Sequence, residues 1–128
     1  WLDMDKHLAE YDLTGVQYRL LNFLYRKVIL EKETVHQNDL EKCFELSKST
    51  VSGLVDRMAK KELIERINEK PYISLVPSEK GIEIISSIKS QRNQTIEKVT
   101  RGLSEEDITR MKNNIRLLIN NIKEEENV

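Results

Sequence analysis

Two helices joined by only three residues are the feature that most restricts the fold of this chain. Residues 48–61 carry apolar side chains at the i, i+3, i+4, i+7 spacing of a helix with one buried face; they are Val51, Leu54, Val55 and Met58. Ser47 precedes this helix as an expected N-cap. A shorter helix is expected over residues 39–46, and the connection Glu45-Leu46-Ser47 is typical of a helix-turn-helix.

The other segments predict further helices and one β-hairpin. Thr14 and Gln17 have capping-box spacing, which starts a helix that runs to about Leu30. Runs of β-branched and apolar residues at 63–67 and 72–76 flank a polar connection and predict two antiparallel strands. Long helices follow Ser78 and Ser104, with Gly102 as the stop between them, and residues 2–11 read as the end of another helix. We therefore expect a mostly α protein with a small β-hairpin, an α+β fold.

Length and composition agree with a soluble protein. The 128 residues fit one domain, residues 1–128. No uncharged apolar run approaches the roughly 18 residues of a membrane span, and no signal peptide is visible. A single cysteine excludes an intramolecular disulfide and a multi-cysteine zinc site. We expect a cytoplasmic protein that does not enter a membrane.

The charges are distributed unevenly along the chain. The net charge is −1, but residues 47–70 hold six basic and four acidic side chains, and residues 71–102 hold five and three. The outward face of residues 48–61 combines hydroxyl groups and cations with one acid, Asp56. Such a face suits a helix that enters the major groove of DNA. Taken alone, it also suits the solvated side of an ordinary amphipathic helix.

The sequence of this region resembles the MarR family of bacterial transcription regulators. The similarity lies in Leu46-Ser-Lys-Ser-Thr-Val-Ser-Gly-Leu-Val-Asp-Arg-Met58, followed by Leu63-Ile-Glu-Arg66 and Ser78-Glu-Lys-Gly81. Leu13-Thr14 with Gln17, and Leu103-Ser-Glu-Glu106, also match family landmarks, so the resemblance covers about residues 13–122. It implies a homodimeric repressor with a winged helix-turn-helix lobe over residues 13–78. Residues 1–12 and 79–124 then supply the dimerisation helices, and sensing of a small-molecule effector is typical of the family.

This resemblance implies double-stranded DNA, a pseudo-palindromic operator, as the partner. The side chains expected to read base edges are Ser49, Thr50 and Ser52, and those expected to contact phosphate are Lys48, Arg57 and Lys60. Ser47, at the start of this recognition helix, is also expected to contact DNA. Gln37 and Asn38, which begin the preceding helix, are expected to present N–H groups to phosphate.

Departures from the family pattern leave two questions open. The wing is several residues shorter than usual and lacks an aspartate-x-arginine pattern, so Arg66 or Lys70 must substitute if the wing contacts DNA. Arg66 has an alternative role, an ion pair with Asp56. Gly53 either allows the backbone to approach DNA closely or is a tolerated glycine on an exposed face. Glu45 and Glu62 occupy positions where the family often has glycine, and His36 stands where a hydroxyl cap is usual.

An apolar stripe on the last helix predicts the dimer interface. Its members are Ile108, Met111, Ile115, Leu118, Ile119 and Ile122. The alternative is that the terminal helices fold back on their own core.

The remaining candidates for redox, metal-binding or catalytic residues are expected to have no such role. Cys43 is expected to be a buried structural thiol, with a redox sensor as the alternative. His7 and His36 lack a metal-binding spacing, so we expect no metal and no cofactor. No catalytic motif is present, so we expect no enzyme. The alternative functions are a winged-helix protein-interaction module and a ligand sensor with weak DNA binding.

Overall fold

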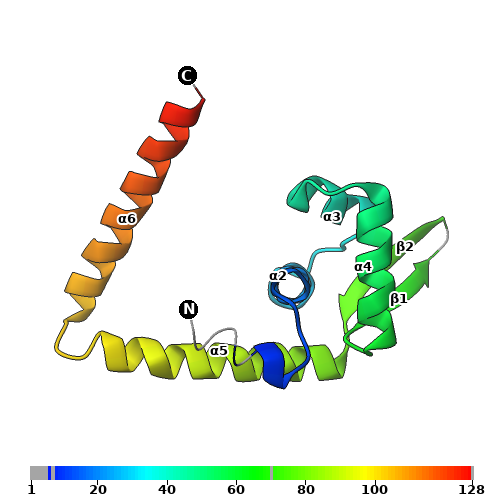
Figure 1. Ribbon diagram of the computed structural model, residues 1–128, viewed down its shortest axis with the longest axis horizontal. Coiled ribbons are helices and arrows are strands. Elements are labelled where there is room, and N and C mark those ends of the chain that lie inside the picture. The colour runs from blue at the N-terminus through cyan, green and yellow to red at the C-terminus, as the bar shows by residue number, and fades with distance from the viewer. Residues whose placement is uncertain (1–5, 7, 70, 128) are drawn as a thin grey trace. The chain divides into compact units, whose positions relative to one another are not determined.

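Two compact units, Trp1–Arg92 and Asn93–Val128, make up the chain (Figure 1). The computed structural model describes residues 6, 8–69 and 71–127. The predicted helix over residues 2–11 therefore lies mostly outside the described residues, although residues 8–10 are helical.

Helix α2 (Gly15–Leu24) begins at the predicted capping box. The Gln17 backbone N–H donates to Thr14 Oγ1, and the Thr14 backbone N–H donates to Gln17 Oε1, both at 3.2 Å. The helix continues to Leu30, as expected, but its last turns form a π-helix, η1 (Tyr25–Leu30).

The two helices of the helix-turn-helix are α3 (Gln37–Phe44) and α4 (Lys48–Lys60). The four predicted apolar positions of α4 are all buried, and the Ser47 side chain caps its first turn as expected. Helix α3 begins and ends two residues earlier than predicted. Its start follows from His36 as N-cap, whose N–H donates to Asp39. Its end follows from the left-handed conformation of Glu45.

Cys43 corrects one expectation, because this thiol is exposed. An eight-residue helix presents only a narrow stripe to its neighbours. In α3 that stripe is filled by Leu40, which is buried, and Phe44, which packs against the core. Cys43 falls beside the stripe and faces solvent.

The hairpin consists of β1 (Ile64–Glu69) and β2 (Tyr72–Pro77), paired from Ile64 opposite Pro77 to Glu69 opposite Tyr72. The first strand is longer at its tip than expected, since Asn68 and Glu69 pair with β2 instead of belonging to the connection. At its base the Leu75 N–H donates to the Val35 carbonyl at 2.8 Å. The hairpin is thereby fixed to the start of α3.

One core unites α2, α3, α4, the hairpin and the first half of α5 (Glu79–Val99). Its most deeply buried members include Leu21, Leu40, Val55, Leu75 and Ile85. Helix α5 ends three residues before Gly102, the predicted stop, and Gly102, with φ of 91°, makes the following turn. Helix α6 (Glu105–Glu126) then starts at the predicted cap, where Ser104 and Asp107 form a capping box.

Left-handed backbone explains why glycine would suit two glutamate positions. Glu45 has φ of 53° and Glu62 has φ of 60°. For a residue with a Cβ, the left-handed conformation costs about 1–2 kcal/mol in the folded state. Substitution by glycine removes this cost, but glycine also has a larger conformational entropy in the unfolded state, which offsets part of the gain.

We therefore expect Glu45→Gly to raise the free energy of unfolding by about 0.5–1 kcal/mol. Denaturant unfolding monitored by circular dichroism measures the change. Glu65→Gly, on an exposed site of β1, is the control and should lower stability. A loss of stability in Glu45→Gly would contradict the explanation.

Candidate nucleic-acid interface

The outer face of α4 displays polar and basic side chains over a fully packed inner face. Lys48, Ser49, Thr50, Arg57 and Lys60 are exposed, while Ser52 and Gly53 are half-buried. The inner face is locked by the core, so the outer face has a fixed orientation. The structure thus gathers on one helix surface seven of the residues that the sequence predicts to contact DNA.

Three hydroxyl groups form a small network at the N-terminus of α4. Ser47 Oγ accepts from the Thr50 backbone N–H at 3.2 Å and donates to Thr50 Oγ1 at 2.8 Å. Ser49 Oγ lies 3.3 Å from Ser47 Oγ. Because Thr50 Oγ1 accepts from Ser47, its own hydrogen is oriented away and can be donated to a base acceptor.

The start of α3 offers a weaker anion site than the sequence predicts. Asn38 is exposed and Gln37 is half-buried in the first turn, where N–H groups are unsatisfied. Asp39 stands in the same turn and accepts the His36 backbone N–H at 2.8 Å. Its carboxylate already occupies the positive end of the helix and repels a phosphate there.

Arg66 forms the predicted ion pair with Asp56. The Arg66 guanidinium donates to Asp56 Oδ1, which joins the hairpin to α4. The pair removes the only acid of the outer face of α4 from competition with phosphate. Lys70, the other expected wing contact, lies outside the described residues.

The described part of the wing is not strongly basic. Glu65, Glu69 and Tyr72 are exposed, and the Tyr72 ring meets His36 edge-on at 5.6 Å between centroids. Acidic side chains repel the phosphate backbone. The exposed side chains of the described hairpin residues therefore suit a role in supporting α4 better than a role in contacting DNA.

A cavity of about 580 Å³ opens beside the recognition helix, between the start of α2, the end of α3 and α4. Apolar side chains, among them Val16, Phe44 and Leu54, form most of its wall, and Arg19, Thr50 and Arg57 contribute polar groups. This volume lies in the range of small-molecule sites, roughly 300–1,000 Å³. The sequence pattern gives no signal for it because its walls come from three separate elements.

Helix α6 exposes the apolar stripe that the sequence predicts for a dimer interface. No residue of α6 is buried. Ile108 is half-buried, and the other five positions, from Met111 to Ile122, are between 45% and 61% exposed. Ile96, Val99 and Leu103, which the stripe does not include, are also exposed and belong to the same unit.

Two other kinds of site are absent from the described residues. No group of three or more histidine, cysteine, aspartate or glutamate residues there is arranged to hold a metal ion. No helix in the described ranges is both long and apolar enough to cross a membrane.

Comparisons with known proteins agree with the geometry of α3, α4 and the hairpin. A family model described as MarR family matches residues 11–71. A MarR family protein from Bacillus stearothermophilus superposes with a TM-score of 0.77 at 25% identity, covering 95% of this chain and 84% of that one. No curated protein matches the sequence significantly.

MepR, a transcription regulator of the Staphylococcus aureus multidrug efflux pump MepA, has a similar fold in two solved complexes. Its complex with DNA gives a TM-score of 0.73 at 25% identity, covering 92% of this chain and 87% of that one. Its complex with ethidium bromide gives 0.75 at 24% identity, covering 93% and 85%. The shared fold therefore extends beyond the residues that the family model matches.

Proposed function

We propose that this chain, whose residues 11–71 match a MarR family model and whose fold matches that of a MarR family protein, is a sequence-specific DNA-binding regulator and not an enzyme. It acts as a homodimer on a pseudo-palindromic operator, with α4 in the major groove. The observation that carries the proposal is the outer face of α4, where hydroxyl groups and cations stand on a rigidly packed helix. MepR, whose complex with DNA is solved, supports the same use of this fold.

The proposed DNA contacts fall into two groups by chemistry. Ser49, Thr50 and Ser52 present short hydroxyl groups that suit base edges, and so specify sequence. Lys48, Arg57 and Lys60 carry charges that suit phosphates, and so add affinity that depends on salt. Arg66 acts through Asp56 and holds α4 against the wing. Gln37 and Asn38 contribute less, because the Asp39 carboxylate lies in the same turn. Lys70 is a further proposed phosphate contact.

Dimerisation uses the exposed stripe of α6 together with the neighbouring apolar residues of its unit. A protein that kept these side chains in water would forgo about 25 cal/mol for each Å² of apolar surface. A second copy of the chain presents the same stripe and covers it symmetrically.

A small molecule that fills the cavity beside α4 is the proposed effector. The cavity wall includes Thr50 and Arg57, which are proposed DNA contacts, so a bound ligand and DNA compete for the same side chains. MepR bound to ethidium bromide supports regulation by a small molecule. Release of a labelled operator on ligand addition measures the competition.

Selection of duplexes from a randomised pool tests the DNA-binding proposal directly. The expected result is enrichment of one pseudo-palindromic sequence, bound by two chains per duplex in sedimentation. Recovery of no enriched sequence would contradict the proposal and leave a protein-interaction module, which the acidic wing with exposed Tyr72 favours.

Gly53 gives a separate test of how close the backbone comes to DNA. A Cβ added at Gly53 would have only the end of the Arg57 side chain within 4 Å, at 3.8 Å, so the fold does not need this glycine. Gly53→Ala is expected to raise the free energy of unfolding by about 0.5–1 kcal/mol, since glycine is a poor helix former. If the backbone lies against DNA, the same variant binds the selected operator more weakly. Equal operator affinity in anisotropy titrations would show that the glycine is merely tolerated.

A further inference from the structure

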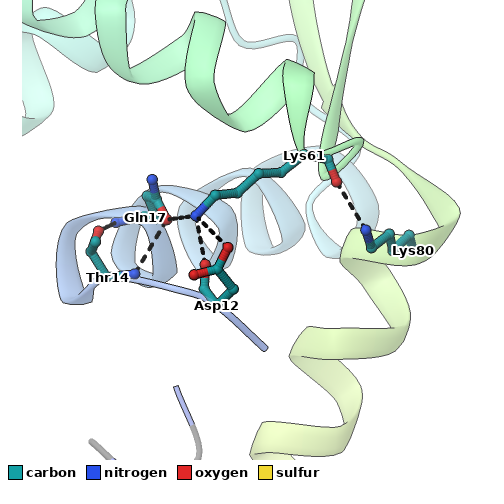
Figure 2. A network of polar contacts seen from close by, with 5 residues as sticks. All are labelled: Asp12, Thr14, Gln17, Lys61 and Lys80. Carbon is teal, nitrogen blue, oxygen red and sulfur yellow. Dashed lines mark hydrogen bonds and ion pairs between the residues drawn. The ribbon is translucent and has the colours of Figure 1, made fainter. Parts of the chain in front are cut away.

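Lys61, at the C-terminal end of α4, has polar partners unlike those of the neighbouring Lys60. Its ammonium donates to the Asp12 backbone carbonyl at 2.6 Å and to Gln17 Oε1 at 3.0 Å. The Asp12 carboxylate lies 3.5 Å away. Figure 2 shows these groups converging on the Lys61 Nζ atom. Of the three donors of this ammonium, two are used in these hydrogen bonds, and the carboxylate adds an ion pair.

The backbone carbonyl of Lys61 is in turn held by the start of α5. The Lys80 ammonium, in the first turn of α5, donates to the Lys61 carbonyl at 3.0 Å (Figure 2). Ser78 adds two further bonds, from its hydroxyl to the Glu62 carbonyl at 2.6 Å and from its N–H to the Leu63 carbonyl at 2.9 Å. The exit of the recognition helix is thus fixed to the start of α5.

These hydrogen bonds join α4 to both segments that the sequence predicts for dimerisation. Asp12 links the helical residues 8–10 to α2, and α5 begins the second segment. In a dimeric DNA-binding protein, the separation of the two recognition helices sets the half-site spacing that the protein accepts. A contact that fixes the end of α4 to these segments therefore bears on that separation.

We propose that Lys61 is a positioning residue that sets the half-site spacing of the operator. It does so without touching DNA, because its ammonium is engaged by Asp12 and Gln17. Lys60, which is exposed and has no polar partner among the described residues, is the phosphate contact of this pair. The inference rests on the proposed function.

Two matched variants, Lys61→Met and Lys60→Met, separate positioning from phosphate binding. Each is titrated against the selected operator and against duplexes with one base pair added or removed between the half-sites, over a series of salt concentrations. Wild-type protein should prefer the native spacing by about tenfold or more. Lys61→Met should retain the salt dependence but lose part of this preference, because the link from the end of α4 to Asp12 is gone while the core and the bonds from Ser78 and Lys80 remain.

Lys60→Met should show the opposite pattern. Its spacing preference should remain, while the slope of log affinity against log salt concentration should become shallower by about 0.9 for each phosphate that is no longer neutralised. Lys61→Arg, which keeps a cation on a long stem, should recover part of the spacing preference. A merely structural lysine would change the affinity for every duplex alike and leave the ratio between spacings unchanged.

An unchanged spacing preference in Lys61→Met, or a fall in its salt slope like that of Lys60→Met, would overturn the inference alone. Wild-type protein that does not distinguish its operator from scrambled DNA would overturn the proposed function and this inference with it. Thermal unfolding is measured first. If Lys61→Met does not fold, Lys61→Gln, whose shorter and uncharged side chain loses the ion pair with the Asp12 carboxylate, takes its place and is judged by the same spacing ratio.

Discussion

Replacing Ile119 with aspartate is expected to turn the dimer into monomers and to abolish operator binding. Ile119 is the fifth of the six residues of the exposed α6 stripe and is 45% exposed in the single chain. Dimerisation would bury the new carboxylate without a partner, which costs several kcal/mol per protomer. A loss of about 4 kcal/mol in dimer stability raises the dissociation constant roughly a thousandfold.

Sedimentation velocity and operator titrations at the same protein concentration measure both effects. Asn113→Asp is the matched control, since it adds the same charge on the opposite side of α6, given about 100° of rotation per residue. This control should remain dimeric and bind DNA. A wild-type monomer, or an Ile119→Asp variant that still forms dimers, would contradict the proposed interface.

Gly81→Ala is expected to destabilise the fold more than any other single-methyl addition at a glycine of this chain. A Cβ at Gly81 would lie 2.3 Å from the Leu63 carbonyl oxygen and 3.0 Å from Leu21 Cδ1. The carbonyl is backbone and cannot rotate away, because it also accepts the Ser78 N–H. Overpacking of this kind costs about 1–3 kcal/mol, and the junction between the hairpin and α5 must shift.

Gly15→Ala provides the control for this prediction. Its added Cβ would have nothing within 4 Å, so stability should stay the same or rise slightly. Denaturant midpoints of both variants are compared with that of the wild type. Equal stability of Gly81→Ala and wild type would contradict the close contact between position 81 and the Leu63 carbonyl.

The elements that are local in sequence could be predicted from it. The cap at Ser47 and the apolar face of α4 follow from residue spacing alone, and so does the capping box at Ser104. The ion pair between Asp56 and Arg66 could also be anticipated, because α4 and β1 adjoin along the chain and the sequence suggests no other partner for Asp56.

Other features depend on interactions between distant segments and leave no local signal. The Lys61 ammonium meets residues about 44 to 49 positions away in sequence, and no motif distinguishes it from Lys60. The cavity beside α4 is walled by α2, α3 and α4 together. Cys43 is exposed, because the width of the buried face of α3 depends on how this helix packs against the core and not on its composition.

The ratio of affinities for matched and scrambled duplexes, measured for wild type and Thr50→Ala, tests the central claim most directly. Thr50 Oγ1 is held by Ser47 with its hydrogen free to reach a base. Removing a hydrogen bond to a base costs about 1–3 kcal/mol, so the variant should bind the matched duplex roughly tenfold or more weakly and the scrambled one almost as before. An equal reduction on both duplexes, or no preference in the wild type, would contradict a recognition role for α4.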